Sequence, residues 1–262
     1  MNTTFLDISV AQFQVFLLVF VRTIGILAIS PVFGHRAVIS QSKAGLALVI
    51  AMVLFPVVPL TLSPTGELLP YVLLAIKELI MGMILGFTAL LVFIAVQFAG
   101  EVIGIDIGFG VVNIIDPLSA EQISIIATFK NLIALVVFLM INGHHTILNA
   151  LAASFDMVPL GGMMFTELLG RGLIAITSQV FVMAIKLATP VIAALFLTSL
   201  ALGIVARTVP QMNVFIVGFP MKIGIGMGII MLTLPLFQTI LVKYFNGMAA
   251  NFSLLLQQMY RP

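Results

Sequence analysis

Residues 71–99, YVLLAIKELIMGMILGFTALLVFIAVQFA, form the stretch that decides the class of fold. The stretch is apolar almost throughout, and a helix that crosses the hydrocarbon core of a bilayer needs about 20 such residues. It exceeds this length, so we expect its helix to tilt, to break or to extend beyond the bilayer. Lys77 and Glu78 interrupt it, and neighbours on a helix point about 100° apart, so these two side chains cannot pair face to face.

The composition of the whole chain indicates a membrane protein. Of its 262 residues, 62% are hydrophobic and 8% are charged, and the mean hydropathy is +1.29. Soluble domains average about 45–50% apolar and about 25% charged residues, so this chain has too few charges to cover a surface exposed to water. We predict an all-α polytopic membrane protein that forms one unit over residues 1–262. The absence of Cys excludes disulfides, and the scattered Lys and Arg residues argue against nucleic acid as a partner.

Apolar stretches of membrane-spanning length recur along the chain. The N-terminal segment lacks a positively charged region, so we expect the first stretch to be retained rather than cleaved. Proline inside the last two stretches predicts kinks at Pro190, Pro220 and Pro235. Basic residues in the connections favour an orientation with both termini outside. The six candidate spans are about 10–31, 44–62, 71–99, 123–141, 173–204 and 213–242.

Several charged residues lie within or at the ends of these apolar stretches. Each would cost about 2.5–3.5 kcal/mol at the centre of a lipid-facing helix. We expect Lys43 and Lys243 to reach the interface with their long side chains. Pairing across helices, within the chain or with a partner subunit, better explains Lys77, Glu78, Lys130 and Lys222.

The glycines suggest close helix packing and one break. The pairs Gly82/Gly86 and Gly224/Gly228 have the spacing that lets helix backbones approach, and Gly100, Gly104 and Gly108 repeat it. The segment 104–110 holds more Gly than a helix favours, which predicts a break or loop there. Two interpretations remain open: a plain turn between helices, or a loop that projects into a pore with Phe109 as its apolar tip.

No catalytic, metal or cofactor site emerges from the sequence. The glycines at 224–228 lie inside an apolar segment without a preceding strand, unlike a phosphate-binding loop. His144 and His145 are adjacent and lack the spacing of a metal site. We therefore expect a protein that is not an enzyme and needs no cofactor.

Four clusters of residues resemble a known family of export proteins. The most specific is Ala206-Arg207-Thr-Val-Pro210-Gln-Met-Asn-Val-Phe-Ile-Val-Gly218-Phe-Pro220-Met-Lys222. The others are Arg22-Thr-Ile-Gly25 with Pro31-Val-Phe-Gly34, Glu101-x-x-Gly104-x-Asp106-x-Gly108 with Asp116-Pro117, and Asn142-Gly-His-His145 with Ser154 and Pro159. Together they are similar to the FliR family, the R subunits of type III secretion export gates. The similarity covers essentially the whole chain.

This resemblance implies an assembly of bent helical hairpins. R subunits join FliP and FliQ, with FlhB and FlhA as further partners, in a closed conduit for unfolded flagellar proteins. The resemblance implies a place in the bacterial inner membrane at the flagellar basal body, with much of the assembly above the bilayer plane. It also implies a P-like part over about residues 1–200 and a Q-like part over 201–262. Sister subunits as well as membrane lipid would then cover the apolar helices.

The resemblance further implies a loop that helps to plug the central channel. Its matching residues are Asp106, Gly108, Phe109, Gly110, Val111 and Asn113, with Phe109 at the constriction. Candidate contacts to other subunits are Arg22, Lys77, Glu78, Glu101, Asp116, Lys130, Arg207 and Lys222. Two alternatives stay open. One is the R subunit of a virulence-type secretion system, and the other is a secondary transporter of a small solute, in which broken helices and intramembrane charges are common.

Overall fold

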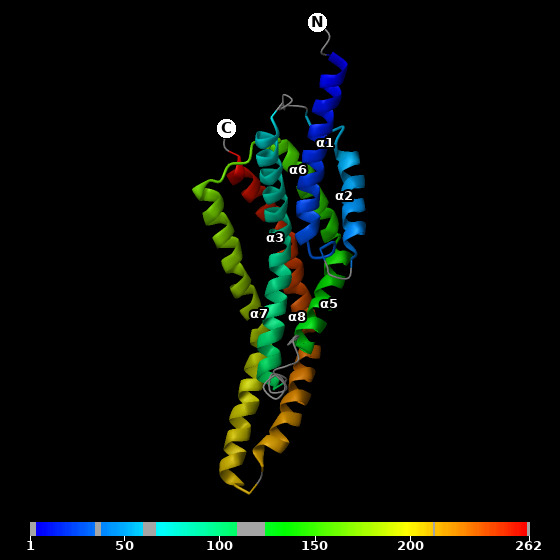
Figure 1. The fold of residues 1–262 in the computed structure, drawn as a ribbon. Helices are drawn as coiled ribbons and strands as arrows, with labels where there is room; N and C mark the ends of the chain where they lie inside the picture. Colours follow the sequence, from blue (N-terminus) through cyan, green and yellow to red (C-terminus); the bar gives the residue numbers. More distant parts are fainter. Residues whose placement is uncertain (1–3, 35–37, 60–66, 109–123, 212, 261–262) are drawn as a thin grey trace. The chain divides into compact units, whose positions relative to one another are not determined.

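Every regular element in the described part of the chain is an α-helix. The computed structural model describes residues 4–34, 38–59, 67–108, 124–211 and 213–260, without the side chains of 4–9, 214 and 215. Its helices are α1 (Thr4–Ile29), α2 (Ser40–Leu54), α3 (Leu68–Ile107), α5 (Ile125–Met140), α6 (Gly143–Met157), α7 (Glu167–Thr208) and α8 (Val214–Met259) (Figure 1). This confirms the predicted all-α fold.

Four of these helices are long and apolar enough to cross a membrane. Their candidate spans are Val10–Ile29, Leu68–Ile107, Glu167–Thr208 and Ile216–Met259. A fifth forms if α5 and α6, which bend by 64° at their short break, count as one span. The chain is therefore a polytopic membrane protein. The 40 residues of α3 would extend about 60 Å if straight, twice the hydrocarbon thickness of about 30 Å, so the expected tilt or extension follows from length.

The second predicted span is wrong in length. Residues 44–62 were expected to cross the bilayer, whereas α2 ends at Leu54 with 15 residues, and Phe55 to Val58 form turns. Pro56 follows Phe55 directly, and proline disfavours a continuing helix before it. Hydropathy does not distinguish an apolar turn from an apolar helix, so the stretch looked longer than the helix is.

The predicted linker 142–172 is also wrong, because it contains α6. Its polar residues lower the hydropathy, but Ile147, Leu151 and Phe155 repeat every four residues and are buried. Asn142 precedes the helix with a φ of +57°, in the left-handed region that Asn tolerates. This residue turns the chain sharply between α5 and α6.

The break predicted over 104–110 starts later than expected. Helix α3 continues through Gly104 to Ile107, and the chain leaves it at Gly108, whose φ is +110°. Gly104 serves close packing instead, since a Cβ there would overlap the Ser124 hydroxyl at the start of α5. Helices α7 and α8 stay helical through Pro190, Pro220 and Pro235, and the kinks at these positions remain a prediction.

The chain forms two compact units, each assembled from separated segments. Unit 1 comprises Met1–Leu91, Asn142–Thr177 and Asn246–Pro262, and unit 2 comprises Val92–Ile141 and Ser178–Phe245. In unit 1, α1 and α2 run side by side (Figure 1). In unit 2, Phe93, Phe138 and Phe245 form an aromatic core with ring centroids 5.1–5.6 Å apart. These units do not correspond to the P-like and Q-like parts, which remain a prediction.

Candidate functional site

A buried ion pair joins two helices of unit 1. Arg22 on α1 donates through Nε to Glu78 on α3, and both side chains are wholly buried. The other guanidinium nitrogens donate to the carbonyl oxygens of Ser154 and Val158, at 2.9 and 3.2 Å. The second carboxylate oxygen of Glu78 accepts the backbone N–H of Gly161 at 2.7 Å. We call these five residues the Arg22 node.

The Arg22 node holds the end of α6. The Ser154 carbonyl, in the last turn of this helix, also accepts the backbone N–H of Val158 at 3.0 Å, and the Val158 carbonyl lies just beyond that turn. The guanidinium therefore adds donors at a helix end where a cation is favoured. The guanidinium also lies 4.3 Å from the centroid of the Phe155 ring. The expected pairing of Glu78 across helices is confirmed within the chain, while its contact to another subunit stays a prediction.

Glycine lets α1 and α3 approach closely beside this node. A Cβ at Gly25 would lie 2.7 Å from the carbonyl oxygen of Leu79, and one at Gly86 would lie 2.6 Å from that of Ile26. Real Cβ atoms do not approach backbone oxygens so closely. The close packing predicted from Gly82 and Gly86 is therefore confirmed.

Lys130 is a buried cation in unit 2. It is 3% exposed, and its ammonium lies 4.8 Å from the ring centroid of Phe237. The ion pairs of the described residues are Arg22 with Glu78 and Arg171 with Glu167, so Lys130 has no carboxylate partner among them. Its contact is instead with the face of an aromatic ring, which attracts a cation.

A chain of polar side chains connects α3 and α5 in the same unit. Gln97 donates its amide to the Glu101 carboxylate at 2.8 Å, and Asn131 donates its amide to Gln97. The sequence reasoning did not single out Gln97 and Asn131. Polar amides inside apolar helices were the available signal, because they hydrogen-bond across helices in membranes.

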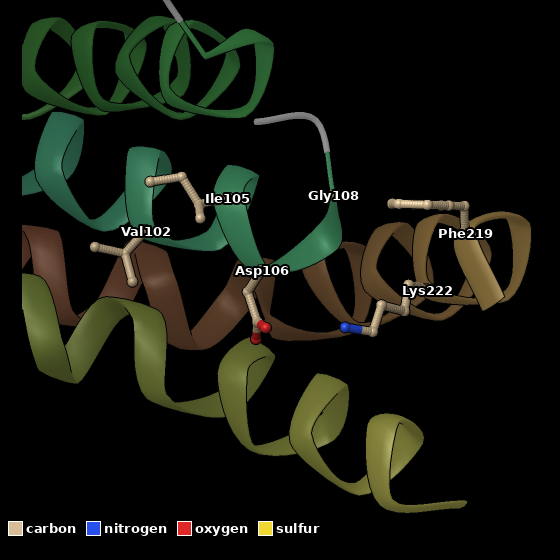
Figure 2. A pocket seen from close by; sticks show the side chains of 6 residues that line it. All are labelled: Val102, Ile105, Asp106, Gly108, Phe219 and Lys222. Atoms are coloured by element: carbon tan, nitrogen blue, oxygen red, sulfur yellow. The ribbon is translucent and has the colours of Figure 1, made fainter. Parts of the chain in front are cut away.

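A cavity of about 440 Å³ opens at the end of α3 in unit 2. Figure 2 shows Lys222 extending from α8 toward the side on which Asp106 of α3 lies. A Cβ at Gly108 would lie 2.8 Å from the Phe219 ring, so glycine permits this contact as well as the positive φ. The residues that line the cavity are Val102, Ile105, Asp106, Gly108, Phe219 and Lys222.

The structure brings only some of the predicted site residues together. Asp106, Gly108 and Lys222 meet at the cavity, whereas Lys77 is half-buried on α3 and Arg207 is exposed at the end of α7. The remaining predicted residues lie outside the described part of the chain: Phe109, Gly110, Val111, Asn113 and Asp116. Their roles remain predictions.

No metal site is present in the described part of the chain. No three His, Asp or Glu side chains there are grouped so that they could hold an ion. His144 and His145 have ring centroids 4.2 Å apart at the start of α6. The expectation that the chain is not an enzyme remains an expectation.

The family profile and the individual relatives that match this chain point to the same protein family. The profile of the bacterial export proteins, family 1, matches residues 13–248. The flagellar biosynthetic protein FliR of Bacillus subtilis is 37% identical over 223 residues, which is 82% of this chain and 83% of the relative. FliR of Escherichia coli K12 is 31% identical over 82% of both chains, and FliR of Aquifex aeolicus is 28% identical over 94% of this chain and 95% of its own. The chain belongs to the FliR family of bacterial export proteins. It is thus a membrane protein of flagellum biosynthesis and type III protein export.

The fold explains where the residues that mark the FliR family lie. The cluster of Arg22 and the cluster of Ser154 meet in the Arg22 node of unit 1. The cluster that ends at Gly108 and the cluster that ends at Lys222 meet at the cavity of unit 2. In this FliR-family chain, two of the four clusters therefore contact each other in unit 1, and the other two line one cavity in unit 2.

Proposed function

We propose that this chain is a core structural component of the flagellar export gate. It forms, with FliP and FliQ, a closed conduit through which unfolded flagellar proteins leave the cell, and it catalyses no reaction. The gate lies in the bacterial inner membrane at the flagellar basal body. The observation that carries the proposal is the similarity to FliR proteins at 31–37% identity over more than 80% of both chains.

The burial of the long helices supports a role in an assembly. Only 22% of the spanning window of α8 and 39% of that of α7 are buried inside the chain, compared with 56% for α3. Large apolar side chains therefore remain on the surface of these helices, Leu232 and Ile204 among them. Gly224 and Gly228 on α8 have open space where a Cβ would stand. Such faces suit contact with lipid or with helices of other subunits.

Co-purification tests the proposal. The tagged full-length chain is co-expressed with FliP and FliQ, extracted in mild detergent and analysed by native mass spectrometry. We expect one complex that contains all three proteins, with FlhB and FlhA joining when they are also expressed. A chain that purifies by itself, or only with copies of itself, in the presence of both proteins would contradict the proposal.

The segment that follows Gly108 is proposed as the plug of the conduit. The resemblance assigns Phe109 to the constriction, and Gly108, which lines the cavity with Asp106, directly precedes this segment in the sequence. Replacement of Phe109, Val111 and Asn113 by small residues should raise ion leakage through the assembled complex. An unchanged leak in complexes of normal composition would refute the plug assignment.

Family membership favours this function over the two alternatives. A secondary transporter of small solutes would purify without FliP and FliQ and would show solute uptake. An R subunit of a virulence-type system would share the mechanism and differ in its exported proteins. The relatives compared above are flagellar biosynthetic proteins, which favours the flagellar system.

A further inference from the structure

The cavity at the end of α3 holds two side chains of opposite charge that are not paired with each other. Asp106 of α3 and Lys222 of α8 both line it, and Figure 2 shows Lys222 extending toward the side on which Asp106 lies. Neither side chain forms an ion pair or a hydrogen bond within the described part of the chain. All residues that line the cavity belong to unit 2. We call it the Asp106/Lys222 cavity.

The two charged groups have complementary hydrogen-bonding capacities. An ionised carboxylate only accepts hydrogen bonds, and an ammonium group only donates them. Asp106 and Lys222 are both half-buried, so each has lost part of its hydration and gains from a partner that replaces it. A ligand that satisfies both groups must therefore present a donor and an acceptor inside one cavity.

The size and the apolar wall of the cavity limit what can enter it. Val102, Ile105 and Phe219 line it beside the two charges. Its volume of about 440 Å³ lies within the range of about 300–1,000 Å³ that is typical of pockets for small ligands. A few residues of extended polypeptide fit such a space, whereas a folded domain does not.

A polypeptide main chain offers the required donor and acceptor at every residue except proline. Each such residue carries one N–H and one C=O group, whatever its side chain. Under the proposed function the conduit passes unfolded proteins of differing sequence, so a contact useful to all of them must be made with the main chain. A zwitterionic lipid headgroup also carries both charges. The conduit is the better source, because Gly108 of this cavity directly precedes the segment proposed as the plug.

We propose that the Asp106/Lys222 cavity binds the main chain of the unfolded polypeptide in transit, with Asp106 accepting an N–H and Lys222 donating to a carbonyl oxygen. The inference rests on the proposed function and adds the residues that hold the exported chain. Binding of this kind tolerates any side chain, which the apolar wall accommodates. It is weakened by proline, which has no N–H to donate.

Photocrosslinking to an arrested export substrate tests the binding site. A benzophenone amino acid replaces Ile105, which lines the cavity and is 69% exposed. The full chain is expressed with FliP, FliQ and the remaining flagellar export proteins. The substrate is a flagellar protein fused to a stably folded domain, so that its unfolded part is held in the complex.

Three substrates differ only in the arrested segment, which is rich in Gly and Ser, in Ala and Thr, or in Pro. Yields are compared per polypeptide retained in the complex. We expect similar yields for the first two segments. The proline-rich segment should give a yield about tenfold lower, as loss of a hydrogen bond to a charged group does.

Variants of the two charges test the same contact from the side of this chain. Asp106→Ala removes the acceptor and Lys222→Met removes the donor, so each should lower the yield of the Gly/Ser-rich substrate about tenfold. Lys243→Met is the matched control and should leave the yield unchanged, because Lys243 is an exposed lysine of α8 in unit 2 that does not line the cavity. The double exchange Asp106→Lys/Lys222→Asp again provides one donor and one acceptor and should restore most of the yield.

The outcomes separate this inference from the proposed function. The inference is wrong if the proline-rich substrate crosslinks as strongly as the others, if Asp106→Ala and Lys222→Met leave the yield unchanged, or if Ile105 crosslinks only lipid. Should a variant fail to assemble, the proline-rich substrate still decides, because it leaves the cavity unaltered. Any of the contrary results with the polypeptide held in a normal complex would overturn the binding site alone. An arrested polypeptide that is absent from the complex of this chain with FliP and FliQ would overturn the proposed function.

Discussion

Arg22 and Glu78 lie 56 positions apart in the sequence and form a wholly buried ion pair between α1 and α3. Their remaining hydrogen-bonding groups are taken up by backbone atoms of Ser154, Val158 and Gly161. A buried pair is costly to desolvate, so such satisfaction is what makes the arrangement stable. The node therefore fixes how three segments of unit 1 meet.

Removal of one partner of this pair should destabilise the protein strongly. Glu78→Gln leaves the guanidinium charge buried without its counter-charge, which costs about 3–5 kcal/mol. Thermal unfolding in detergent, followed by circular dichroism, should show a large fall in the midpoint. The double variant Arg22→Met/Glu78→Met should be more stable than Glu78→Gln, because no charge stays buried. A Glu78→Gln variant as stable as the parent would show that the pair contributes little.

An exposed ion pair gives the matched comparison. Arg171 and Glu167 pair across one helical turn with side chains 73% and 80% exposed. Solvent screens such a pair, so Glu167→Gln should leave the midpoint nearly unchanged.

Alanine at Gly82 should be far more harmful than alanine at Gly45. A Cβ at Gly82 would overlap the carbonyl oxygen of Arg22 and force α1 from α3, whereas Gly45 on α2 has nothing within 4 Å. In the second case the better helix propensity of Ala should stabilise by about 1 kcal/mol. Unfolding midpoints of the two variants check the sign of each effect. Equal effects at both positions would contradict the close approach of α1 and α3.

Lys130 should be replaceable by an apolar residue of similar length. Its buried ammonium has an aromatic ring as its contact, and desolvation of the charge opposes folding. We expect Lys130→Met to be neutral or stabilising and Phe237→Ala to cost about 3–5 kcal/mol through the cavity it leaves. Both are measured by unfolding of the isolated chain. If Lys130→Met preserves that stability but weakens the complex with FliP and FliQ, the predicted subunit contact of Lys130 gains support.

Alanine at Gly108 should disturb the end of α3. The φ of +110° is unfavourable for any residue with a Cβ, by about 1–3 kcal/mol, and the added methyl group would meet Phe219. Swimming motility of a strain that carries only Gly108→Ala should fall, while Gly203→Ala on α7, which has open space, should swim normally. Normal motility of the Gly108→Ala strain would show that the geometry at this position is dispensable.

Parts of the fold and site could be predicted because they depend on local sequence. Apolar runs predicted the long helices, and glycine spacing predicted the close packing at Gly82. Helix α6 was missed because hydropathy averages over both faces, so the buried stripe at Ile147 and Leu151 was diluted by polar neighbours. The partners of Glu78 could not be predicted, since a charge in an apolar run shows only that a partner is needed.

The sequence by itself determined the all-α class, the hydrophobicity of a membrane protein and the family. These depend on composition, on the length of the apolar stretches and on motif residues, all of which can be read directly from the sequence. Only the tertiary structure decided which distant segments meet. It joined Arg22 to Glu78 and to the end of α6, and it set Lys222 at the same cavity as Asp106. The physical reason is that pairing of buried polar groups depends on distance and orientation in space, which sequence separation does not encode.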